Sequence, residues 1–136
     1  MADLYPGLAL GDALNPRDCQ MIPCKCESAV TKGQLVIFHT HTAGEIPSVA
    51  TAGALGTNVL GIAMKSGGIG DIIPVGRRGI FKVKGSGAIT GGVLVVADVT
   101  GQVQTIAANT FEKVVGRAIQ TFGAGENDGL VDLGYP

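Results

Sequence analysis

The sequence has no tryptophan and few other aromatic residues, which together make up 4% of its 136 positions. Proteins that bind single-stranded nucleic acid stack bases on aromatic side chains, and sugar sites also use aromatic faces. Charged residues are scarce as well, at 15%, and the formal net charge is −1. Because such a chain produces no long-range positive field, nothing in it would attract nucleic acid. The composition therefore argues against nucleic acids and sugars as ligands.

Long apolar runs are also missing, since none approaches the roughly 18 residues that a membrane-spanning helix needs. We therefore expect no membrane span. Residues 1–10 lack a basic region followed by an apolar one, so no signal peptide is expected. The chain has three cysteines, Cys19, Cys24 and Cys26, all near one end. An odd, clustered set does not form a disulfide framework and is typical of a reducing compartment.

Glycine, by contrast, is abundant: it occurs at 22 positions, between runs of valine, isoleucine and leucine. This spacing is typical of many short strands joined by tight turns. No segment keeps an apolar period of about 3.6 residues, so little helix is expected. The strands are expected at residues 21–27, 34–40, 45–51, 58–64, 71–75, 79–85, 93–98, 102–107, 113–120 and 129–133.

One pattern occurs twice along the chain. Residues 29–36 read AVTKGQLV, and residues 88–95 read AITGGVLV. Each copy has a small residue, a β-branched residue and threonine, then a turn ending in glycine and an apolar run. This order predicts a strand end, a tight turn and a new strand. A V-x-G-x-A motif at residues 59–63 likewise returns at residues 114–118, so the chain is interpreted as two copies of one β unit.

The two copies span about residues 20–76 and 79–134. Two independent domains of this size would be only marginally stable, so the copies are expected to share one core. The fold expected is all-β. It is a compact barrel-like domain of short strands, residues 20–136, built from two tandem similar units and preceded by an N-terminal arm, residues 1–19.

The N-terminal arm matches neither unit and is more apolar than an ordinary solvated tail. Two interpretations stay open: the arm packs on its own domain, or it docks on a neighbouring subunit or partner. In the second case, removing the arm should abolish partner binding and leave folding intact. The apolar residues available for either contact are Leu4, Tyr5, Leu8, Leu10 and Leu14.

The densest positive patch is Arg77 and Arg78, with Lys82 and Lys84 just beyond. Such a patch is either a solvated strand end or a contact surface for an acidic partner. No arrangement of nucleophile, base and carboxylate can be picked out along the sequence, so no enzyme activity is expected.

Two pairs of metal-ligating residues occur in the first unit. His39 and His41 share one face of an expected strand, and so do Cys24 and Cys26. Cysteine and histidine are the preferred ligands of zinc, so the four together could form a site. Their spacing differs from the usual structural zinc pattern, and neither pair returns in the second unit. No metal site is therefore expected.

Ala63-Met64-Lys65 resembles the lysine-bearing turn of biotinyl carrier domains, which are also small β structures with two similar halves. This resemblance implies a carrier domain of the biotinyl or lipoyl type, modified at Lys65. The sequence departs from that family at Ser66, where the family has a second methionine. The carrier function is kept as the alternative, and an intact mass showing stoichiometric biotin or lipoate would support it.

The doubled pattern as a whole resembles the capsid decoration, or cement, proteins of tailed bacteriophages. The resemblance rests on the small-Val-Thr-x-Gly turn, the apolar strand after it, the V-x-G-x-A motif and a glycine loop, each present twice. The residues concerned are Ala29 to Gly33 with Leu35 and Val36, Val59 to Ala63, Gly79 to Lys84, Ala88 to Gly92 with Leu94 and Val95, Gly101 to Val103, and Val114 to Ala118.

This resemblance implies a structural virion protein that needs no cofactor and catalyses no reaction. Such proteins are made in the host cytoplasm, sit on the outside of the major capsid shell, often as homotrimers, and stabilise the shell. The implied partner is the major capsid protein, and an N-terminal arm often contributes to the contact. The candidate capsid-contact residues are Leu4, Tyr5, Leu8, Leu10, Leu14, Arg77 and Arg78.

Overall fold

The computed structural model describes residues 8–15, 17, 19–39, 44–53, 59–98, 101–106, 113–122 and 128–133. The expectation of an all-β fold is confirmed, because the regular elements in these ranges are β-strands. None of the described residues belongs to a helix with the length and apolar character needed to cross a bilayer. The strands are β1 (Gln20–Cys26), β2 (Leu35–Phe38), β3 (Ser48–Thr51), β4 (Val59–Ala63), β5 (Ile72–Lys84), β6 (Leu94–Ala97), β7 (Val103–Thr105), β8 (Val114–Ala118) and β9 (Asp128–Leu133).

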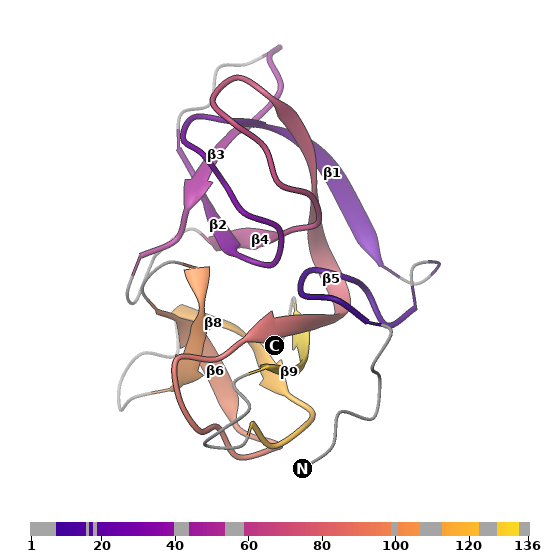
Figure 1. The fold of residues 1–136 in the computed structure, drawn as a ribbon, viewed down its shortest axis with the longest axis vertical. Helices are drawn as coiled ribbons and strands as arrows, with labels where there is room; N and C mark the ends of the chain where they lie inside the picture. Colours follow the sequence, from indigo (N-terminus) through magenta and orange to yellow (C-terminus); the bar gives the residue numbers. More distant parts are fainter. Residues whose placement is uncertain are drawn as a thin grey trace.

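The strands β1 to β5 form a closed barrel, which is the upper part of the molecule in Figure 1. Starting from β1, the neighbours around the ring are β3, β2, β4 and β5, and β5 pairs with β1 again. The ring therefore leaves no free sheet edge along these pairings. β1 and β3 run parallel, whereas the other neighbours in the ring are antiparallel.

β5 is 13 residues long and belongs to both halves of the molecule. Its first part, up to Arg78, pairs with β1, and its second part, from Gly79, pairs with β9. In Figure 1 the strand runs down the upper barrel, bends and continues into the lower half. The expectation of two strands, at residues 71–75 and 79–85, is therefore wrong. Gly79, with a φ of 128°, lies inside a continuous strand and does not end one.

The second half has the same order of neighbours. β5 is followed by β9, β8, β6 and β7. Among the described residues, one parallel bridge, between Gly85 just after β5 and Val103 in β7, brings the last strand back to the first. This half therefore forms a second ring, held together at one point by a bridge in place of a full strand pairing.

The two halves share their pairing registers. In the pairing of β2 with β4, Val36 lies opposite Gly61, and in that of β6 with β8, Val95 lies opposite Gly116. A register shift follows one residue later in both. Two copies of one unit would produce this correspondence. That the chain arose by such a duplication stays a prediction.

The repeated turn owes its form to one glycine. The carbonyl oxygen of Thr31 accepts a hydrogen bond from the amide of Gln34 at 3.1 Å, and Gly33, the third residue of the turn, has a φ of 94°. A type II turn requires a positive φ at its third position, which favours glycine there. Gly92 has the same φ at the matching place in the second half.

The described residues form two hydrophobic clusters in the interior. The larger surrounds Phe81 and Phe122 in the second half and also includes Leu35, Ala52 and Ile62 from the first. The two halves therefore share the larger cluster. The closed first barrel encloses the smaller cluster within it. That smaller cluster contains Cys24, Cys26, Val30, Val36, Val49, Leu60, Ala63, Ile73 and Val75.

The segment before β1 lies along β5. The amide of Gly11 donates to the carbonyl oxygen of Lys82 at 2.9 Å, and the amide of Leu14 donates to that of Ile80 at 2.7 Å. Between them, Ala13 is 5% exposed and belongs to the larger core cluster. This part of the N-terminal arm packs on its own domain. The expectation that folding would survive removal of the whole arm conflicts with these bonds and this burial.

Candidate functional site

Arg77 and Arg78 lie where β5 passes from the first barrel to the second half. A β-bulge sets their direction. Met21 pairs with Gly76 and Gln20 pairs with Arg78, so Arg77 is an extra residue without a partner in β1. A bulge can turn successive side chains toward one side of a strand, where regular alternation would separate them. Both side chains are exposed, and both line the same pocket.

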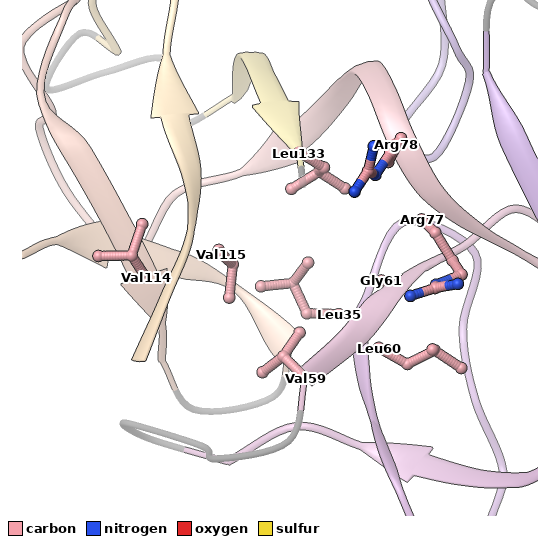
Figure 2. A pocket seen from close by; sticks show the side chains of 9 residues that line it. All are labelled: Leu35, Val59, Leu60, Gly61, Arg77, Arg78, Val114, Val115 and Leu133. Atoms are coloured by element: carbon pink, nitrogen blue, oxygen red, sulfur yellow. The ribbon is translucent and has the colours of Figure 1, made fainter. Parts of the chain in front are cut away.

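This pocket, called the junction pocket below, lies between the two halves and has a volume of about 210 Å³. Figure 2 shows the two arginine side chains on one side of it and aliphatic side chains around the rest. The aliphatic side chains come from β2, β4, β8 and β9. The residues that line the junction pocket are Leu35, Val59, Leu60, Gly61, Arg77, Arg78, Val114, Val115 and Leu133.

The walls of the junction pocket come from matching positions of the two halves. Val59 and Leu60 begin β4, and Val114 and Val115 begin β8. These residues open the two V-x-G-x-A motifs, so the repeated motifs meet at the pocket. The pocket is therefore a product of docking one half against the other.

The size of the junction pocket limits what it can hold. Sites for drug-sized ligands usually measure about 300–1,000 Å³, whereas an apolar cavity of about 150 Å³ can accept benzene. A volume of about 210 Å³ therefore suits a single aliphatic or aromatic side chain and is too small for a large cofactor.

The charge of the junction pocket is positive. None of the described residues that line it is acidic, and neither arginine has an ion pair or a side-chain hydrogen bond with another described residue. Guanidinium groups bind carboxylates through paired, charge-assisted hydrogen bonds. The pocket can thus bind an apolar group and a carboxylate side by side.

The other predicted contact residues do not line the junction pocket. Leu4 and Tyr5 lie outside the described residues. Leu8, Leu10 and Leu14 are half-buried in the segment that packs against β5. The structure therefore brings together the two predicted arginines and leaves the predicted leucines at another place.

Two lysines hold the N-terminal segment. The Nζ atom of Lys82 donates to the carbonyl oxygen of Leu8 at 3.0 Å, so this lysine of the predicted positive patch serves the fold. The Nζ atom of Lys32 lies 2.6 Å from Oδ1 of Asp12. The hydrogen bond from Lys32 lowers the pKa of Asp12, although partial desolvation opposes the shift. A second oxygen of the same carboxylate accepts from the amide of Ala9 at 2.9 Å.

The candidate metal ligands do not form one group. Cys24 and Cys26 are fully buried inside the first barrel, whereas His39 is exposed after the end of β2, and His41 lies outside the described residues. Burial raises the pKa of the Cys24 thiol to about 11, so it stays protonated at neutral pH. Within the described part of the chain, no three histidine, cysteine or acidic residues are placed to hold a metal ion.

Lys65, the residue of the carrier hypothesis, is exposed in the loop between β4 and β5. The loop is fastened to the first barrel, because Oγ of Ser66 accepts from the amide of Lys32 at 2.8 Å and Gly67 forms a bridge with Val30. β4 and β5 are antiparallel neighbours, so Lys65 lies in a hairpin loop, as the lysine of a carrier domain does. The departure from the carrier family is therefore the sequence at Ser66 and not the position of the lysine.

Comparison with known families decides between the two resemblances. The sequence pattern of the phage cement proteins matches residues 15–133, which include both halves and the junction pocket. The chain belongs to the phage cement protein family. The resemblance to cement proteins is confirmed, and membership identifies the chain as a phage virion structural protein.

A solved structure of similar fold is the N base of the head fiber gp8.5 of bacteriophage phi29. The TM-score is 0.65, with 85% of this chain and 93% of that chain covered at 15% sequence identity. At this identity the likeness shows the fold alone. No curated protein matched the sequence.

For this cement-family member, sequence reasoning found the two arginines of the junction pocket and missed its aliphatic walls. Val59 and Val114 stood out only as parts of a repeated motif. A useful signal was present in the motif: a glycine at the same place in both copies, just after two large apolar residues. Such a glycine indicates that backbones meet there, and the apolar residues before it are then candidates for the contact between halves.

Proposed function

We propose that the protein binds the outside of the major capsid shell of a phage and stabilises it. The observation that carries this proposal is the match to the phage cement family across residues 15–133. The architecture supports the proposal. A closed barrel continued by a second ring through one strand gives a body with few free edges, so it offers little to uncontrolled strand pairing.

The proposed state is a homotrimer, made in the host cytoplasm and added to the capsid exterior. A capsid repeats the same site many times, so a modest contact per copy is multiplied over the shell. Trimerisation would make the second and third contacts intramolecular, which raises the effective concentration at the surface. The mass of the free protein in solution, from light scattering, tests this part directly.

The central test is a titration of the purified protein against undecorated, expanded capsid shells. We expect saturable binding in sedimentation and a higher melting temperature of the shell. Shells that already carry a full set of decoration protein are the control and should bind no more. A lack of binding at micromolar concentration would contradict the proposed function.

The capsid contacts assigned to the N-terminal arm stay predictions. Because part of this arm packs on β5, the suitable variant lacks only residues 1–7 and keeps the described bonds of Gly11 and Leu14. If the arm contacts the capsid, this variant should bind more weakly and melt at the same temperature as the full chain. This deletion tests Leu4 and Tyr5, whereas Leu8, Leu10 and Leu14 remain in the variant and their capsid contact stays a prediction.

A further inference from the structure

We propose that the junction pocket receives one aliphatic side chain of the capsid protein, and that Arg77 and Arg78 bind a carboxylate next to that side chain. The inference rests on the proposed function, because it states how the capsid surface is recognised. It assigns a recognition site to a place that is assembled only when the two halves dock.

The first argument is the unbalanced charge at the pocket. Two guanidinium groups stand on successive residues, and the cross-strand neighbour of Arg78 is the neutral Gln20. Like charges held side by side repel each other, and no described lining residue offsets them. The bulge at Arg77 keeps both groups on the pocket side. A carboxylate supplied from outside would relieve this repulsion and accept hydrogen bonds from both groups.

The second argument is the apolar rim beside these charges. Leu35 is fully buried, and Leu60, Val115 and Leu133 are between 4% and 9% exposed, so these four side chains support the pocket from beneath and expose little surface to it. Val59 and Val114 are partly exposed and stand at its rim. A single aliphatic side chain entering here would contact both halves at once. Its apolar surface would be removed from water, which favours binding.

The third argument concerns the kind of partner. The volume of about 210 Å³ is too small to enclose a large cofactor. A protein surface can present an aliphatic side chain and a carboxylate in one fixed geometry. Arginine is among the residues that carry most of the affinity in protein interfaces. The capsid surface is the partner to which we commit, and a second copy of this chain is the competing occupant that the experiment separates.

The test compares three proteins in the capsid titration and in light scattering: wild type, Arg77→Gln with Arg78→Gln, and Lys25→Gln with Lys65→Gln. The two variants lose the same charge, and the control lysines are exposed and do not line the pocket. We expect the arginine variant to bind shells at least about tenfold more weakly and with less dependence on salt. The control should stay within about twofold, and both should melt like wild type because the altered side chains are exposed.

The outcomes separate this inference from the function on which it rests. If wild type binds and the arginine variant binds equally well, the pocket proposal is wrong and the capsid function stands. If the arginine variant loses its trimer mass and each subunit still binds the shell, the occupant is a second copy and the proposal is overturned. If wild type itself does not bind, the proposed function fails and this inference fails with it.

Discussion

Single glycines determine how closely the strands of this protein can approach. A Cβ atom placed on Gly61 would lie 2.0 Å from the carbonyl oxygen of Gly76, and one on Gly116 would lie 2.2 Å from that of Asp132. Side chains do not tolerate contacts this short with backbone atoms. The central glycine of each V-x-G-x-A motif is therefore needed for β4 to lie against β5 and for β8 to lie against β9.

Replacing either glycine should push the paired strands apart. We expect Gly61→Ala to lower the free energy of unfolding by about 1–3 kcal/mol, because the new methyl group must push two strands apart. Urea denaturation followed by circular dichroism measures the change. Gly87→Ala is the matched control, since a Cβ there meets nothing within 4 Å. Equal stability of the two variants would show that the strands adjust without cost.

At the scale of elements, the N-terminal segment pairs with β5 as an additional strand would. The ion pair between Asp12 and Lys32 holds the segment in place. The pKa of Asp12 is lowered from 3.8, mainly by that hydrogen bond. A carboxylate whose pKa is lowered in the folded state stabilises that state at pH values above its ordinary pKa. This contribution is lost as the pH falls through the lowered pKa.

The Asp12→Asn variant tests this fastening. At pH 6 we expect weaker protection of the Gly11 and Leu14 amides against hydrogen exchange, because their hydrogen bonds to β5 then break more often. The global change should stay below about 1 kcal/mol, since both partners are about a third exposed. Below pH 3.8 the difference from wild type should shrink. Asp128→Asn, an exposed carboxylate in β9, is the control, and an equal effect there would contradict the assignment.

The elements could largely be predicted from the sequence, with one informative exception. Alternating apolar residues and turn glycines placed the short strands within a few residues of their observed bounds. The joining of two expected strands into β5 was missed. Gly76 and Gly79 on either side of two arginines have the composition of a turn, and only the pairings with β1 and β9 keep this stretch extended.

The whole molecule should unfold as one unit, because β5 contributes to both rings and the larger core cluster includes residues of both halves. Phe122 tests this. It is 1% exposed in the second half, and we expect Phe122→Ala to cost about 3–5 kcal/mol of stability. Hydrogen exchange should show the slowest amides of both halves losing protection together.

The control for this prediction is Phe38→Ala, because Phe38 is 41% exposed and lies outside both clusters. Phe38→Ala should lower the melting temperature by much less than Phe122→Ala does. If Phe122→Ala instead produced two transitions, with the first barrel as stable as in wild type, the halves would be independent folding units.

At this scale the candidate site could be predicted only in part. The charge of Arg77 and Arg78 was visible, since adjacent arginines are conspicuous in a chain with 15% charged residues. The apolar walls were not, because Val59 and Val114 meet only when the halves dock, and docking depends on long-range pairing that local patterns do not encode. The bulge that aims Arg77 is equally invisible until β1 and β5 are paired.

The continuity of β5 also bears on protein engineering. In many chains made of repeated modules the boundary between copies is a linker, and foreign peptides are inserted there. Here the boundary is hydrogen-bonded backbone, and an insertion would sever both rings. The loop before β5 is the better place for a displayed epitope or tag, because Ile69 is 78% exposed and Gly70 has open space around it.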